Sequence, residues 1–406
     1  MRSSSISAKL RVACYVGLSL LAPLNAHAAR PAFAYVNANP NNGANSVSAV
    51  RIADSGQAEA VLGSPFATGG FGLAPATGAE FAHRIDVSRN RNLLFAANDG
   101  SGSIAAFTVN PFNGILRAVP GSPFTVSGWT SFSGISLAVS DDGRFLYASG
   151  LTLVSFFIDA AGALTPIGSQ WQFPERVGGI DVSNDNSQLF VNTTDGVYIL
   201  HTGESGLSAA PPAILSVGSA ATDLRLDPTN THLWVGTKNG GILAYTLSPG
   251  NQTVVPGAPF FSSVANLSGL TADSFGRNVF AYSPIGPRLF GARSNADGSL
   301  VAAVNSPLTP LFAPTAGAVI PDGSLLVLTN AQGQLDAWAP EADGSLFHVA
   351  GYPIATGAAP GFAAITTFPE KTPTPTPALP GWFTLALGAA LSWLGARRMN
   401  PAARSS

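Results

Sequence analysis

Cysteine and charged residues are scarce in this sequence. Its 406 residues contain one cysteine, Cys14, and charged residues make up only 10% of the chain. A single thiol excludes an internal disulfide and a cysteine metal cluster. A hydrophobic share of 46% excludes a disordered chain, which would carry more charge and fewer apolar residues. The sequence therefore encodes a folded protein with a sizeable core.

The motifs of several enzyme classes are missing as well. The sequence has no HExxH zinc motif, no G-x-S-x-G nucleophile turn and no Walker A phosphate loop. Only two lysines, Lys238 and Lys371, lie between residues 29 and 396, which argues against nucleic acid as a partner. We therefore expect neither a bound metal nor a cofactor.

Basic residues gather at the two ends of the chain. Six of the 20 basic residues lie before residue 29 or after residue 396, and all 22 acidic residues lie between these positions. The other 14 basic residues leave the stretch 29–396 with a net charge of −8, although the whole chain carries −2. An acidic body between basic ends is typical of an exported chain.

Residues 1–28 have the three parts of a signal peptide. A basic start is followed by the apolar stretch 12–24 and by Ala26-His27-Ala28, the pattern after which signal peptidase cuts. We expect cleavage after Ala28, with an uncleaved anchor as the alternative. Cleavage would also remove Cys14. The mature protein would then lie in the periplasm, at the cell surface or outside the cell.

Residues 369–378 form a predicted Pro/Thr-rich linker, and residues 379–406 form a predicted C-terminal tail. As a helix, the apolar residues 379–396 would span roughly 27 Å, enough for a bilayer core. Arg397 and Arg398 follow and would hold that end in the cytoplasm. The layout resembles the bacterial PEP-CTERM and IPTL-CTERM sorting tails, and residues 376–382 keep the Pro, Leu and Trp of the IPTL motif. The resemblance implies processing by an exosortase-type protease and delivery to the cell surface; a permanent membrane anchor is the alternative.

A unit of four predicted strands recurs seven times between residues 29 and 368. Its clearest marker is the second strand, an apolar run around a central large residue. These central residues are Tyr35, Phe95, Tyr147, Phe190, Trp234, Phe280 and Val327, at steps of 60, 52, 43, 44, 46 and 47 residues. A four-stranded propeller blade needs about 40–50 residues, so the first two steps contain inserted loops. We predict an all-β, seven-bladed β-propeller of four-stranded antiparallel blades over residues 29–368.

The ends of the repeat predict how the ring closes. The first copy begins at its second strand, residues 32–37, and one strand, residues 361–368, is left over after the seventh copy. We predict that these two segments pair, so that the N- and C-terminal strands share a blade. Prolines such as Pro65 and Pro307 recur near the ends of the copies, and we expect each to end an outer strand.

The repeat carries a family resemblance. Residues 86–124 and 137–150, with runs such as SDDGRFLYASG, are similar to the lactonase-family seven-bladed propellers. That family includes bacterial 6-phosphogluconolactonase and the fungal carboxymuconate-lactonizing enzymes, and its repeat reads approximately P-R-H-L-x-x-S-P-D-G-R-x-L-Y-V-x-N. The resemblance covers residues 33–368. It implies a site at one mouth of the central channel, where His, Arg and acidic residues precede the inner strands.

Five residues are candidates for that site. His83 and Arg84 occupy the R-H position of the second unit in swapped order, and the other units lack this pair. In a lactone hydrolase His83 would activate water, Glu175 or Asp223 would orient it, and Arg84 or Arg176 would hold the oxyanion. Structural roles are the alternative: a hydrogen-bonded histidine at a strand entry, a solvated Glu175–Arg176 ion pair, and Asp223 capping a turn.

Two functional hypotheses follow. The first is an exported, surface-sorted module that has largely lost its catalytic residues and binds a small molecule or a cell-envelope protein at the channel mouth. The second is an extracytoplasmic hydrolase of uncharged lactones. The acidic body offers few cations for a phosphorylated lactone, so we disfavour 6-phosphogluconolactonase activity.

Overall fold

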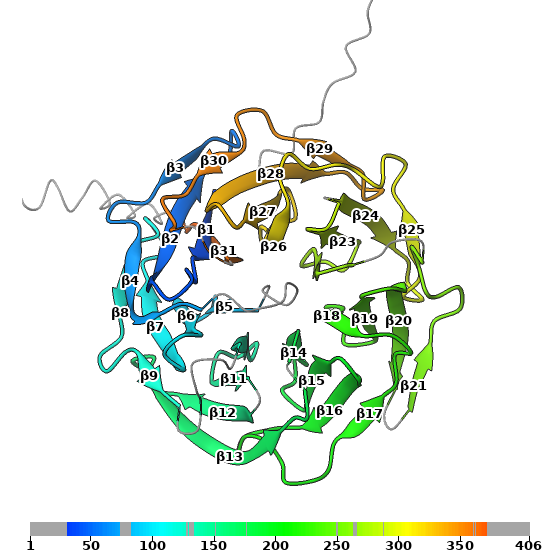
Figure 1. Ribbon diagram of the computed structural model, residues 1–406, viewed down its shortest axis with the longest axis horizontal. Coiled ribbons are helices and arrows are strands. Elements are labelled where there is room, and N and C mark those ends of the chain that lie inside the picture. The colour runs from blue at the N-terminus through cyan, green and yellow to red at the C-terminus, as the bar shows by residue number, and fades with distance from the viewer. Residues whose placement is uncertain are drawn as a thin grey trace, which may run out of the picture.

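Seven antiparallel sheets are arranged in a ring around a central axis in the computed structural model (Figure 1). The structure describes residues 31–371 except 74–82, 127–128, 130–133, 151, 176, 249–250, 263–265, 287, 360 and 362. The predicted signal peptide, nearly all of the linker and the predicted tail lie outside these residues. None of the described residues is helical, so no membrane-spanning helix is found among them.

Each blade has four strands in the same order, from the channel outwards. The inner strands are β5 (Ile85–Ser88), β10 (Ser136–Val139), β14 (Ile180–Val182), β18 (Ala221–Leu226), β22 (Gly269–Ala272), β26 (Pro314–Val319) and β31 (Ala364–Pro369). The second strands are β1 (Ala32–Asn37), β6 (Leu93–Asn98), β11 (Phe145–Ser149), β15 (Gln188–Thr193), β19 (His232–Thr237), β23 (Asn278–Ser283) and β27 (Leu326–Asn330). Each second strand contains the central residue that the sequence predicts for it. The predicted propeller is therefore confirmed.

The outer half of each blade completes the sheet. The third strands are β2 (Ala44–Ile52), β7 (Ser103–Val109), β12 (Thr152–Ile158), β16 (Gly196–His201), β20 (Gly241–Ser248), β24 (Arg288–Ser294) and β28 (Gln334–Pro340). The fourth strands are β3 (Ala58–Ala60), β8 (Leu116–Ala118), β13 (Leu164–Gln172), β17 (Ala213–Leu215), β21 (Asn251–Val254), β25 (Leu300–Ala302) and β29 (Leu346–His348). We number the blades in chain order, so blade 1 contains β1 and blade 7 contains β29.

Three blades have a fifth strand, which corrects the prediction about proline. The short strands β4 (Phe66–Phe71), β9 (Phe124–Thr125) and β30 (Ile354–Ala355) follow a proline and pair again with the third strand of the same blade. The proline turn thus interrupts the outer edge of the blade instead of ending it. In blade 1 the Ser64 hydroxyl accepts a hydrogen bond from the Ala49 amide at 2.9 Å, so the turn leaves no third-strand donor unpaired there.

The ring closes as the sequence predicts. Strand β31 pairs antiparallel with β1 from Ala32 opposite Pro369 to Asn37 opposite Ala364, so the last strand of the chain is the inner strand of blade 1. Beyond it, the Glu370 carboxylate accepts hydrogen bonds from Arg51 at 2.7 and 3.3 Å. Both chain ends of the propeller are therefore held in one sheet.

The hydrophobic core consists of seven clusters, one between each pair of neighbouring blades. The central residue of every second strand lies in one of these clusters and is at most 1% exposed. Tyr35, for example, packs between blades 1 and 2, and Trp234 packs between blades 5 and 6. A large residue recurs at this position because each blade must fill the wedge that it forms with the next one.

Candidate functional site

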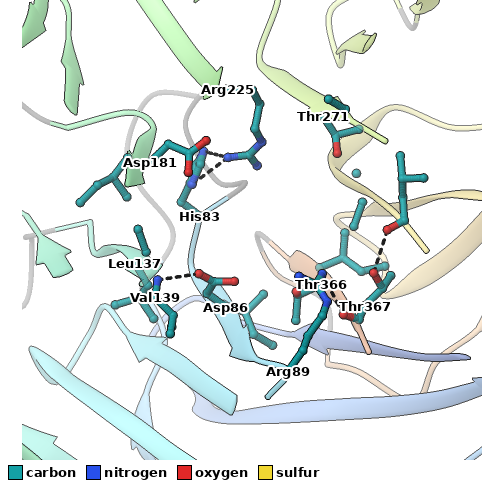
Figure 2. A pocket seen from close by; sticks show the side chains of 18 residues that line it. His83, Asp86, Arg89, Leu137, Val139, Asp181, Arg225, Thr271, Thr366 and Thr367 are labelled. Carbon is teal, nitrogen blue, oxygen red and sulfur yellow. Dashed lines mark hydrogen bonds between the residues drawn. The ribbon is translucent and has the colours of Figure 1, made fainter. Parts of the chain in front are cut away.

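The inner strands of all seven blades line a cavity of about 220 Å³ in the central channel (Figure 2). One residue of each inner strand pairs with the central residue of its second strand and faces this cavity. We call these residues the channel ring: Asp86, Ala138, Asp181, Arg225, Thr271, Ala318 and Thr366. The repeat that predicts the seven blades therefore also identifies the residues that face the channel.

The aspartates around the channel join neighbouring blades. The Asp86 carboxylate accepts one hydrogen bond from the Val87 amide of its own strand and one from the Val139 amide of blade 3, both at 2.8 Å. Asp181 bridges blades 4 and 5 in the same way, and Asp223 bridges blades 5 and 6. These carboxylates thus have a structural role in addition to any contact with a ligand.

A cluster of three side chains crosses one end of the cavity. His83 precedes β5 in blade 2, and its Nε2 atom lies 2.7 Å from Oδ1 of Asp223 in blade 5. The Nη1 atom of Arg225 lies 2.8 Å from Nε2 and 3.2 Å from Nδ1 of the same ring (Figure 2). His83 and Asp223 are only 6% and 1% exposed. We call these three residues the His83 bar.

One nitrogen of the His83 ring is committed to Asp223 in this arrangement. A hydrogen bond to the Asp223 carboxylate requires a proton on Nε2, because a carboxylate only accepts. The remaining lone pair is then on Nδ1. The Arg225 Nη1 atom lies 2.8 Å from Nε2 and 3.2 Å from Nδ1, so it lies over the ring and not in line with that lone pair. A general base needs a lone pair within reach of water or substrate. His83 therefore links blades 2 and 5, and Nδ1 carries the lone pair with which it could act as a base.

Burial and neighbouring charges shift the pKa values of the cluster in opposite directions. Burial by itself would raise the pKa of Asp223, but His83 and Arg225 outweigh it and lower the pKa below its usual value. Burial would lower the pKa of Arg225, but Asp223 and Asp181 outweigh it and raise the pKa. For Asp181 and Asp86 desolvation dominates and raises the pKa. Asp223 and Arg225 are therefore both held in their charged forms.

A glycine in blade 4 makes room for this cluster. A Cβ atom on Gly179 would lie 2.5 Å from Oδ1 of Asp223 and 2.9 Å from the Leu224 nitrogen. We expect Gly179→Ala to lower the free energy of unfolding by about 1–3 kcal/mol, because the carboxylate or the strand must move. Gly203→Ala is the matched control, since nothing lies within 4 Å of that position. Urea unfolding of both variants tests this, and equal stability would contradict the packing described here.

The five predicted site residues do not all meet. His83 and Asp223 are in direct contact, but the Arg84 guanidinium turns to the buried carboxylate of Asp99 and does not line the cavity. Glu175 is exposed, does not line the cavity, and makes no hydrogen bond or ion pair with the residues that the structure describes. Arg176 lies outside those residues. The structure thus brings together one pair of the five.

Comparison with known sequences assigns neither a family nor an activity to this chain. No protein-family model matches the chain, and no curated protein matches its sequence. Solved structures do match. A candidate 6-phosphogluconolactonase of Bacteroides fragilis aligns with a TM-score of 0.66 at 13% identity, over 84% of this chain and 99% of that one. The periplasmic gluconolactonase PpgL of Pseudomonas aeruginosa aligns with a TM-score of 0.61 at 15% identity, over 84% and 100%.

The fold is that of the 6-phosphogluconolactonase-like propellers. A third neighbour, a candidate 6-phosphogluconolactonase of Bacteroides uniformis, aligns with a TM-score of 0.63 at 14% identity, over 83% of this chain and 99% of that one. Identities this low establish the fold alone, so the activity must be argued from the residues of the channel.

Sequence analysis did not single out Arg225, Asp86, Asp181 or Arg89, all of which line the cavity. A signal for the first three was available, because each lies at a constant place relative to the central residue of its blade. Charged residues at that place stand out against the Ala and Thr of the other blades. Nothing comparable marks Arg89, which follows the end of β5.

Proposed function

We propose that this protein binds a small, uncharged molecule rich in hydroxyl groups, such as a sugar or a sugar lactone, in the central cavity. The observation that carries the proposal is the balance of polar groups on the cavity wall. The wall contains two cations, Arg89 and Arg225, and two carboxylates, Asp86 and Asp181. A hydroxyl group both donates and accepts hydrogen bonds, so it can satisfy either kind of partner, whereas a net charge on the ligand would be left uncompensated.

Two threonines of the channel ring are available for such a ligand. Thr271 and Thr366 line the cavity, and neither hydroxyl makes a hydrogen bond to another described residue. Pockets for drug-sized ligands start at about 300 Å³. A volume near 220 Å³ therefore suits a smaller molecule of the size of a single sugar ring.

The His83 bar favours binding over hydrolysis. With Nε2 bonded to Asp223, His83 keeps one lone pair, on Nδ1, and the ring is buried, which leaves little room beside it for both a lactone and an attacking water. Hydrolysis stays the second candidate because His83 and Asp223 do meet beside the cavity, at 2.7 Å. The assay is a panel of uncharged lactones on the wild-type protein and on His83→Ala. A rate that falls at least about tenfold in the variant would support hydrolysis, and equal rates would reject it.

The binding proposal makes a prediction about Thr366. Thr366→Val keeps the shape of the side chain and removes its hydroxyl, so we expect the dissociation constant for the bound sugar or lactone to rise about five- to tenfold. Isothermal titration calorimetry with D-glucose, D-glucono-1,5-lactone and D-gluconate measures this. Thr108→Val is the matched control, because Thr108 is exposed on β7, away from the channel. Absence of binding by all three probes would reject the proposal.

The location of the protein is part of the proposal. The three-part N-terminal segment supports export with cleavage after Ala28, and the apolar segment before Arg397 supports membrane attachment with processing by an exosortase-type protease. A protein of the cell envelope is then a second possible occupant of the channel mouth. Intact mass of the protein recovered from the cell surface tests the processing, because a species that still ends at Ser406 would reject it.

A further inference from the structure

The two ends of the central channel differ in exposure. All seven inner strands run in the same direction, so each begins at the end where His83 lies and finishes at the end where Arg89 lies. At the first end the residues at the starts of the strands are buried: His83, Ile135, Gly178, Thr222, Ser268 and Thr315. At the second end five of the seven blades present exposed residues: Arg89, Asp141, Asn184, Pro228 and Ser274.

The His83 bar spans the channel at its buried end. His83 comes from blade 2, whereas Asp223 and Arg225 come from blade 5. Blades 2 and 5 are three positions apart, which is the largest separation that a ring of seven allows. Contacts of 2.7 and 2.8 Å between such blades must cross the opening and not run along its wall.

We infer that the cavity is a blind pocket: a ligand enters past Arg89, and the His83 bar closes the far end. This inference rests on the proposed binding function and adds the route and the residue that a ligand meets first. The cavity extends from His83 at one end to Arg89 at the other. Any molecule that reaches Thr271 or Thr366 must therefore pass the Arg89 end.

The Arg89 mouth suits a neutral hydroxylated molecule. Arg89 is exposed, and within the described residues its guanidinium makes one long hydrogen bond, 3.3 Å from Nη2 to the Thr367 carbonyl oxygen (Figure 2). Its other N–H groups make no hydrogen bond to the described residues and can donate to an incoming hydroxyl. Arg225, in contrast, is engaged by the bar. Arg89 is therefore the arginine that selects the ligand at entry.

Thiol labelling tests the route without any ligand. Thr271→Cys in a Cys14→Ser chain places a single thiol on the cavity wall, and iodoacetamide is a small neutral reagent whose reaction is followed by intact mass. We expect Arg89→Trp, which fills the mouth, to slow the labelling at least about tenfold, because thiol modification depends on access. Asn184→Trp is a second mouth variant from blade 4. Arg117→Trp, on the exposed outer strand β8, is the matched control and should leave the rate within about twofold.

A double variant tests the bar. His83→Ala in the Arg89→Trp background should restore the labelling rate to within about threefold of the unblocked chain, because it opens the far end. The inference is overturned if both tryptophan variants leave the rate unchanged, or if removal of His83 restores nothing in the blocked chain. Near-ultraviolet circular dichroism establishes that each variant is folded. Since no ligand is present, these outcomes are independent of whether a sugar or lactone binds.

Discussion

A chain that ends after Ala363 should fail to form a folded propeller, whereas a chain that ends after Lys371 should unfold as cooperatively as the full chain. The first truncation removes β31, the inner strand of blade 1, together with Phe368, which is 0% exposed. Loss of one buried phenylalanine side chain costs about 3–5 kcal/mol, and a whole domain is stable by only about 5–15 kcal/mol. Loss of all the hydrogen bonds between β31 and β1 adds to this cost. The total then exceeds the free energy that stabilises the fold.

Urea unfolding followed by near-ultraviolet circular dichroism measures this effect. A point variant tests a smaller part of the same effect. Phe368→Ala should lower the free energy of unfolding by about 3–5 kcal/mol. Phe112→Ala, at a side chain that is 50% exposed, is the control and should change this free energy by less than about 0.5 kcal/mol. A cooperatively folded chain that ends at Ala363 would show that closure through β1 and β31 is dispensable.

Replacing Asp223 by alanine should lower the free energy of unfolding by about 3–5 kcal/mol, because it leaves His83 without its hydrogen-bond partner and removes a negative charge close to the partly buried Arg225. The carboxylate also accepts hydrogen bonds from the Leu224 and Leu270 amides at 2.8 and 2.7 Å, and these donors would lose their acceptor too. Thermal and urea unfolding measure the loss. Asp54→Ala is the matched control and should be nearly neutral, because Asp54 is exposed and makes no hydrogen bond or ion pair with the described residues.

The contribution of Asp223 to stability should depend on pH, and the direction of this dependence follows from its pKa shift. The pKa of Asp223 is lowered in the folded protein, so its contribution to stability is present above the ordinary aspartate pKa of about 3.9 and is lost as the pH falls through the lower, folded value. Asp223→Asn should therefore reduce the stability most at neutral pH, and its deficit should shrink below about pH 4. A deficit that stays constant from pH 7 to pH 3 would show that the charge of Asp223 is not what stabilises the bar.

The fold was almost fully predictable because its evidence is local. Alternating apolar residues and a large residue such as Tyr147 or Trp234 at the centre of each second strand are properties of single short segments. The extra strands β4, β9 and β30 were not foreseen, because a proline removes one donor without preventing the residues after it from pairing again.

The site was predictable only in part. His83 and Asp223 were selected because they precede inner strands, and they do meet. Arg84 occupies the same predicted position, but its side chain turns to Asp99. His83 and Arg84 both precede β5, and their side chains turn to carboxylates of different blades, Asp223 and Asp99. Arg225 was overlooked because the family pattern directed attention to the strand entries and not to the middle of the strands.

By itself, the sequence determined an acidic, all-β ring of seven repeats whose last strand completes the first blade. These properties depend on composition, on alternation and on the count of the copies, all of which can be read along the chain. Only the tertiary structure decided that His83 lies against Arg225, 142 residues further along, and that this contact closes one end of the channel. The physical reason is that the contact depends on the width of the opening and on the direction of side chains from blades 2 and 5, which no local pattern encodes.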